Sequence, residues 1–184
     1  MSWHLFLSYT CKSRFCSSCG YKYKLVRVEN ILETAYRVQH RQLVFTIPQE
    51  LRKYFFFPFE DLLFQAVKET IYSILNDVYR SNKKTSKKKK YCKNRNIKFT
   101  PGFFSFLHTF GRDIKWNPHI HVLIAEMKIG SDDSIKKWDY FNFDDLSKRF
   151  QKILIDLLTE LGPNVFSNWE RQKAFYKHKN GFYV

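Results

Sequence analysis

Two histidines, His119 and His121, stand two positions apart within an apolar run. Because successive side chains of a β-strand point to opposite faces, these two imidazoles are expected on the same face. Two neighbouring imidazoles can bind one divalent cation when another element supplies a third ligand, and such a cation can polarise a phosphate. His108, in the preceding apolar run, is a candidate third ligand or supporting residue, or simply a packed strand histidine. The other interpretation of the pair is two solvent-facing histidines on a half-exposed strand.

A second group of possible metal ligands lies near the N-terminus. Cys11, Cys16 and Cys19 have the spacing Cys-x4-Cys-x2-Cys. A structural zinc requires four closed ligands, and His4 and the distant Cys92 are the candidates to complete the set. Clustered thiols in a chain without a secretory signal favour a cytosolic metal site over disulfides. The alternative is a group of free surface thiols.

The third chemical feature is positive charge. Among 184 residues, Lys and Arg number 32 against 17 Asp and Glu, which gives a formal net charge of +15 and favours nucleic acid as the partner. The lysine-rich stretch 83–98 is either a phosphate-binding arm or a solvated loop. Candidate DNA contacts are Lys83, Lys84, Lys87, Lys88, Lys89, Lys90, Lys93, Arg95, Arg112 and Lys115. With no apolar run long enough to span a bilayer and no signal peptide, we expect a cytoplasmic protein without membrane contacts.

Apolar periodicity predicts the elements that must position these residues. Helices are expected at residues 22–40, 59–80 and 143–161, strands at 42–48, 103–110 and 118–125, and the opening of a further strand at 181–184. This order predicts an α+β fold, a mainly antiparallel sheet with helices on one face in the ferredoxin-like manner. The expected organisation is a partial zinc ribbon at residues 1–21, a connecting helix at 22–40 and the core at 41–184.

The segment 106–126 contains Leu-His-Thr-Phe-Gly followed by Pro118-His119-Ile120-His121. It resembles the central block of HUH rolling-circle transposases of the bacterial two-tyrosine insertion-sequence family. Residues 40–48 resemble the first core strand of that family, and residues 11–20 resemble the end of its N-terminal zinc-binding domain. The resemblance implies an HUH endonuclease core with Mg²⁺ or Mn²⁺ at the histidine pair. It also implies a tyrosine that attacks single-stranded DNA at insertion-sequence ends, leaving a 5′-phosphotyrosine link and a free 3′-OH.

The tyrosine nucleophile is where this sequence departs from that family. The family carries a Tyr-x-x-Arg-Tyr type motif downstream of the histidines, and no tyrosines after His121 have that spacing. Tyr176 and Tyr183, near several lysines, are the stand-in candidates, although ordinary core or surface aromatics are the favoured interpretation of both. We therefore expect a transposase chain cut back at both ends and catalytically inactive. The alternatives are a non-catalytic basic zinc- and nucleic-acid-binding module, or a chain that folds poorly because its sheet is incomplete.

Overall fold

The computed structural model describes residues 11, 13, 16–56, 59–85, 99–138 and 141–184, without the side chains of residues 60 and 76–85. The chain divides into two compact units, Met1–Arg37 and Val38–Val184. Within the described residues, no helix combines the length and the apolar character that crossing a membrane would require.

The first unit contains one helix, α1, which spans Ser17–Thr34. Cys16 is its N-cap, and the backbone N–H of Ala35 donates to the Ile31 carbonyl at its C-terminal end. The helix expected at residues 22–40 instead begins at Ser17, inside the segment assigned to the zinc ribbon, and ends at Thr34. Gly20 lies in its first turn, where one glycine lowers helix stability by about 1 kcal/mol without ending the helix.

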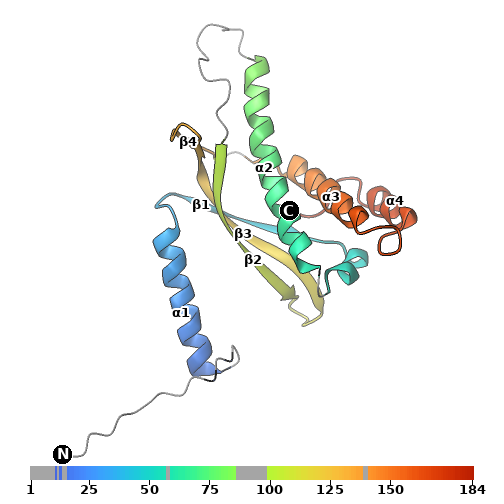
Figure 1. Ribbon diagram of the computed structural model, residues 1–184, viewed down its shortest axis with the longest axis horizontal. Coiled ribbons are helices and arrows are strands. Elements are labelled where there is room, and N and C mark those ends of the chain that lie inside the picture. The colour runs from blue at the N-terminus through green and yellow to red at the C-terminus, as the bar shows by residue number, and fades with distance from the viewer. Residues whose placement is uncertain (1–10, 12, 14–15, 57–58, 86–98, 139–140) are drawn as a thin grey trace, which may run out of the picture. The chain divides into compact units, whose positions relative to one another are not determined.

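The second unit is built on an antiparallel sheet with the strand order β1-β3-β2 (Figure 1). Its strands are β1 His40–Thr46, β2 Phe99–Phe110, β3 Trp116–Gly130 and β4 Ile135–Lys137, the last pairing with the end of β3. The helix α2, Glu60–Thr85, connects β1 to β2, and β3 lies between those two strands. This is a split βαβ arrangement, and it confirms the predicted α+β fold with an antiparallel sheet.

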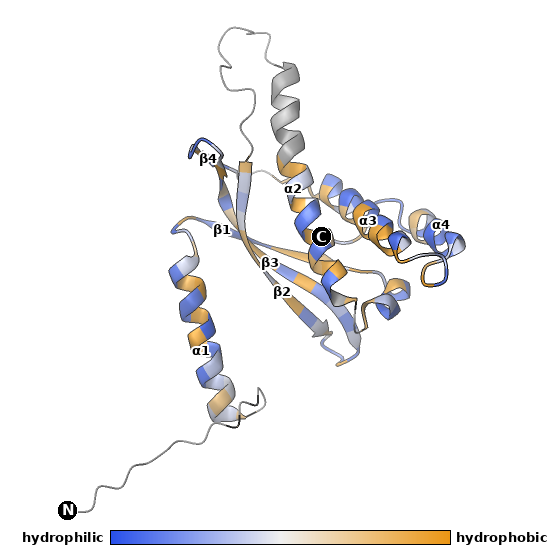
Figure 2. Ribbon diagram, in the orientation of Figure 1, coloured by the Kyte–Doolittle hydropathy of each residue, from blue (hydrophilic) through white to orange (hydrophobic). Residues whose placement is uncertain are grey.

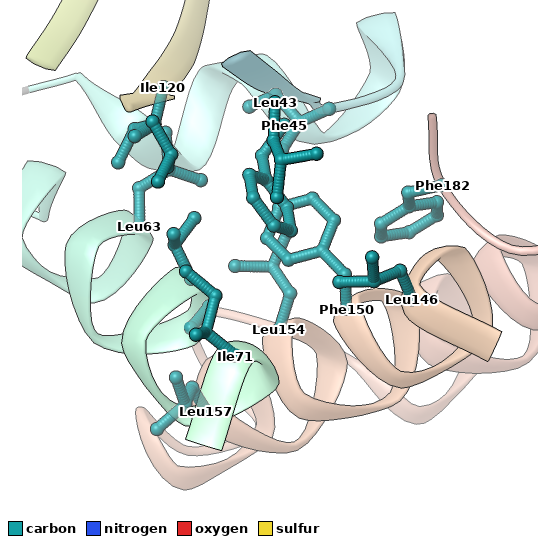
Figure 3. Packing of buried hydrophobic residues seen from close by; sticks show 14 of the residues in the cluster. Leu43, Phe45, Leu63, Ile71, Ile120, Leu146, Phe150, Leu154, Leu157 and Phe182 are labelled. Carbon is teal, nitrogen blue, oxygen red and sulfur yellow. The ribbon is translucent and has the colours of Figure 1, made fainter. Parts of the chain in front are cut away.

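The helices cover one face of the sheet and form the core with it. They are the 3-10 helix η1 Gln49–Phe55, α2, α3 Phe143–Glu160 and α4 Asn168–Lys177. Side chains of the sheet, such as Phe45 and Ile120, pack with Ile71 of α2 and Phe150 and Leu154 of α3 (Figure 3). Figure 2 shows α3 with alternating hydrophilic and hydrophobic positions along its length, as an amphipathic helix requires.

The boundaries of several elements differ from those expected. The strand expected at residues 103–110 begins at Phe99, because a register shift at Gly102 lets the strand pass a proline and a glycine. The helix α2 continues to Thr85, so Lys83 and Lys84 belong to a helix rather than to a loop. The remaining lysine-rich residues, 87–95, lie outside the described residues, as do His4 and Cys92.

The C-terminal segment 181–184 is not a strand, although its backbone approaches one. Phe182 is 2% exposed and packs in the core near Phe150. The backbone N–H of Thr46, on the free edge of β1, donates to the Tyr183 carbonyl at 2.9 Å, and the N–H of Phe182 donates to Ser147. The segment therefore closes the core beside β1 without forming a regular ladder.

Candidate metal centre

Three histidines converge on the face of the sheet opposite the helices. The β2–β3 register sets His108 directly opposite His119, and His121 follows two residues later on β3. The ring centroids are 4.1 Å apart for His108 and His121, 5.1 Å for His119 and His121, and 5.4 Å for His108 and His119. One ring nitrogen from each residue lies within 4.8 Å of the other two. The structure thus brings together the histidine pair and the third candidate from the sequence.

The alternation of the strand explains why these imidazoles share a face. Ile120 and Val122, which flank His121 along β3, are fully buried against the helices. His119 and His121 are half-buried on the other side, and His108 is exposed. A small ligand therefore has access to the cluster from the open face of the sheet.

Two polar groups orient the half-buried rings. Nδ1 of His119 lies 2.6 Å from the Asn117 carbonyl, which can only accept, so Nδ1 is the donor and Nε2 is the nitrogen that can bind a metal. The side-chain amide of Gln42, on β1, lies 2.8 Å from Nδ1 of His121. Sequence reasoning missed Gln42 because its approach to His121 depends on the β1–β3 register. The alternation of the β1 run predicts only which face Gln42 occupies.

The electrostatic environment disfavours the charged form of His121. Burial, followed by the charges of His108 and His119, lowers the pKa of His121 below its usual value. A neutral imidazole retains the lone pair that a metal requires. The cluster found among the described residues consists of three nitrogen donors and no carboxylate. Such a donor set suits a first-row transition ion better than Mg²⁺, which prefers oxygen ligands.

Aromatic and basic side chains surround the histidines. Phe104 lies opposite Leu123 and Phe106 opposite His121, both half-buried in the β2–β3 ladder. In the β2–β3 turn, Arg112 is exposed, whereas Lys115 Nζ lies 3.2 Å from Asp113 Oδ2. That lysine holds the pKa of Asp113 below its usual range. Arg112 is therefore the better placed of the two predicted DNA contacts in this turn.

The two candidate tyrosines occupy different positions. The Tyr183 carbonyl accepts a hydrogen bond from the N–H of Thr46, which lies opposite His119 in the β1–β3 ladder. Phe182 is buried in the core, whereas the neighbouring Tyr183 side chain is 84% exposed. Two strand spacings separate its backbone from that of His119, or about 10 Å. Tyr176 is exposed on α4, in the helical layer.

The thiols of the first unit also converge. One sulfur from each of Cys11, Cys16 and Cys19 lies within 4.8 Å of the other two. A tetrahedral zinc with bonds of about 2.3 Å sets sulfurs about 3.8 Å apart, so this arrangement is close to a zinc-bound one. The backbone N–H of Cys19, followed by the Cys11 thiol, lowers the pKa of Cys16 to about 7. A lowered pKa favours the thiolate that binds metal.

Two family models match this chain, one over each of the two clusters. The family described as "Putative transposase" matches residues 102–179, which include the three histidines. The family described as "Transposase zinc-binding domain" matches residues 4–47, which include the three cysteines. Together the two matches cover about two thirds of the chain. No solved structure matches.

A curated relative gives the same assignment. The chain is 29% identical over 159 residues to the transposase for insertion sequence element IS801 of Pseudomonas savastanoi pv. phaseolicola. The match covers 83% of this chain and 33% of the relative, so the chain spans about a third of that protein's length. Two family matches in the same order as the sequence motifs, with a relative that matches across most of the chain, identify the family. The chain belongs to the insertion-sequence transposases of the HUH rolling-circle type.

Proposed function

We propose that this chain forms the metal-dependent, single-stranded-DNA-binding core of an insertion-sequence transposase. The observation that carries the proposal is the convergence of His108, His119 and His121 on the open face of the sheet. These three residues would hold one divalent cation, with Mn²⁺ a better fit than Mg²⁺ to three imidazoles. When bound, the cation would offset the charge that develops on a scissile phosphate.

The surface around the histidines supports DNA as the ligand. The half-buried rings of Phe104 and Phe106 lie on the same face as the cluster, and unpaired bases stack on such rings. The formal net charge of +15 supplies the attraction to a phosphate backbone. Single strands fit this face better than a duplex, because only unpaired bases expose their π-faces to aromatic side chains.

The covalent step requires a tyrosine, and residues 1–184 contain no Tyr-x-x-Arg-Tyr motif. The proposal is therefore that these residues bind DNA and metal but do not attack the phosphate themselves. One observation favours a second candidate, in which Tyr183 attacks: its side chain is 84% exposed, and its carbonyl accepts from the N–H of Thr46, the register partner of His119. In that reaction the phenol oxygen bonds to phosphorus, the bond to the 3′-oxygen breaks, and the released 3′-oxygen takes a proton.

Incubation with a 3′-labelled pool of random single-stranded oligonucleotides, with and without Mn²⁺, tests this proposal. We expect the protein to bind the oligonucleotides, and Mn²⁺ to strengthen that binding. We expect no labelled protein–DNA band that survives SDS. A labelled band that disappears in Tyr183→Phe but persists in Tyr176→Phe would make Tyr183 the nucleophile and contradict the binding-only account. Absence of DNA binding in both conditions would refute the proposed function altogether.

The N-terminal cysteines are proposed as a zinc site. Cys11, Cys16 and Cys19 would supply three thiolates, with His4 or Cys92 the candidates for the fourth ligand. We expect elemental analysis of protein purified without added zinc to give one zinc per chain. The Cys19→Ser variant should lose it, and a ratio near zero in the wild-type protein would contradict the site.

A further inference from the structure

The outward-facing side of α4 carries a combination of side chains that the histidine centre does not use. We infer that the stripe formed by Trp169, Gln172, Lys173 and Tyr176, called here the α4 stripe, is a second contact surface for single-stranded DNA. This inference rests on the proposed DNA binding, and adds to it a site on the helical side of the sheet.

The inner side of α4 is fully engaged in holding the helix. Glu170 accepts from Lys53 at 2.9 Å, and forms a capping box with Ser167. Arg171 lies 3.8 Å from Asp156 of α3. Ala174 is buried, and its carbonyl accepts from the side chain of Gln151. These contacts fix the orientation of the helix and leave the opposite side to solvent.

The α4 stripe is aromatic at both ends and polar in the middle. Its members stand at positions i, i+3, i+4 and i+7, which share one face of a helix. Trp169 is 66% exposed and Tyr176 is 74% exposed. The ammonium of Lys173 lies 4.6 Å from the centroid of the Trp169 ring. A tryptophan this exposed, on a helix whose other side is well packed, is typical of a surface that meets a partner.

Charge indicates that the partner is an anion. Residues 169–179 contain four basic side chains, Arg171, Lys173, Lys177 and Lys179, and one acidic side chain, Glu170. Both carboxylate oxygens of Glu170 already accept hydrogen bonds, one from Lys53 and the other from Ser167. The charge of Glu170 is thus neutralised inside the protein. Of the four basic side chains, Arg171 and Lys177 pair with Asp156 and Glu50, and Lys173 and Lys179 face solvent.

Single-stranded DNA is the anion whose bases can also stack on the rings of Trp169 and Tyr176. Bases stack on aromatic side chains regardless of sequence, and neighbouring cations pair with the backbone phosphates. Seven helical positions separate Trp169 from Tyr176 by roughly 10 Å, so each ring would take a different base. The helix α4 lies in the helical layer, where it flanks α3 (Figure 1). The histidines lie on the face of the sheet opposite the buried core. The two surfaces can therefore be tested separately.

The experiment is a fluorescence-anisotropy titration of labelled oligo(dT), run on the full chain and three variants. The Trp169→Ala/Tyr176→Ala pair removes both rings, and the Trp169→Phe/Tyr176→Phe pair keeps two π-faces. Phe143→Ala removes an exposed ring of α3 outside the stripe. All substitutions are at solvent-facing positions, and thermal unfolding checks that each variant folds.

We expect the alanine pair to bind oligo(dT) about 10- to 100-fold more weakly, from the loss of two stacking contacts. The phenylalanine pair and Phe143→Ala should bind nearly as well as the wild type, and Mn²⁺ binding should be unchanged in all of them. If wild type and the alanine pair bind alike, the inference is wrong and the proposed function stands. If the phenylalanine pair is as weak as the alanine pair, or polyglutamate competes as well as oligo(dT), stacking of bases is excluded. If the wild type does not bind oligo(dT), the proposed function fails together with the inference.

Discussion

At the scale of single residues, the chemistry of the histidine cluster depends on which nitrogen of each ring carries the proton. The Asn117 carbonyl settles this for His119. For His121, an amide nitrogen of Gln42 facing Nδ1 would leave the proton on Nε2, where it blocks metal binding. A half-turn of the Gln42 amide presents its oxygen instead, so that Nδ1 donates and Nε2 is free. Gln42 is thus a positioning residue for His121.

Substitutions at Gln42 should tune metal affinity without touching a ligand. We expect Gln42→Leu to weaken Mn²⁺ binding about 10- to 100-fold, because the ring loses its orienting partner. Gln42→Glu should bind at least as tightly as the wild type, since a carboxylate accepts from Nδ1. Calorimetric titration measures both, with Gln65→Leu on the exposed side of α2 as the control. Equal affinities for the Leu and Glu variants would show that Gln42 has no part in the site.

The residues of the site were predictable from sequence to different extents. Strand alternation alone places His119 and His121 on one face. The position of His108 opposite His119 could not be derived in this way, because the register depends on the turn and on the irregularities of β2 near Gly102 and between His108 and Phe110. Gln42 required the register of a strand some eighty residues away in the chain. The alternation within a strand predicts which face of the sheet a side chain occupies. Predicting its neighbours on adjacent strands requires the register of the whole sheet.

At the scale of elements, the closure of the core near the C-terminus depends on one glycine. Gly181 has φ of +91°, and a Cβ there would lie 2.3 Å from the Ser147 carbonyl carbon. This close approach lets Phe182 enter the core and lets its N–H donate to Ser147. The apolar residues of this segment predicted a strand. The sequence could not show that the residue before them, Gly181, adopts a left-handed backbone conformation.

A matched pair of glycine substitutions separates backbone strain from steric exclusion. Gly162 has a similar φ of +94° but nothing within 4 Å of its would-be Cβ. We expect Gly162→Ala to lower the free energy of unfolding by about 1 kcal/mol through strain alone. Gly181→Ala should lower it by on the order of 3 kcal/mol, because Ser147 must also move. Urea denaturation measures both, and equal losses would contradict the close packing of the segment.

The helix α4 was missed from sequence, although Ser167 and Glu170 form the Ser-x-x-Glu pattern of a capping box. Its side-chain contacts should make stability depend on pH. Hydrogen bonds from Lys53, then Tyr54 and the Ser167 backbone, lower the pKa of Glu170 from 4.5 to about 2. Because the folded state lowers this pKa, the contribution is complete at neutral pH and is lost as pH falls from about 4.5 toward 2.

The Glu170→Gln variant tests this contribution. At pH 7 we expect its free energy of unfolding to be on the order of 1–2 kcal/mol below that of the wild type. The difference should shrink between pH 5 and pH 3, as the wild type loses the same interaction. Glu160→Gln, on the exposed surface of α3, is the matched control and should change little at either pH. A difference that stays constant with pH would mean that the carboxylate charge is not what stabilises α4.

At the scale of the whole molecule, the order of the elements predicted the fold class, and the net charge indicated nucleic acid as the partner. The order of strands and helices predicted the antiparallel α+β fold, because β1–α2–β2 with β3 between them buries one face of the sheet under the helices. The second contact surface proposed on α4 was beyond sequence reasoning, since Trp169 and Tyr176 could equally have been core residues. Only the packing of the inner side of α4 shows that they face solvent.

The central claim is that three histidines of this transposase chain form one metal centre. Calorimetric titration of Mn²⁺ into the wild type, His121→Ala, His108→Ala and His40→Ala tests it most directly, since His40 lies on β1 outside the cluster. We predict one Mn²⁺ per chain in the wild type and in His40→Ala, weaker binding in His108→Ala, and none in His121→Ala. Equal binding by wild type and His121→Ala, or no binding by the wild type, would contradict the account.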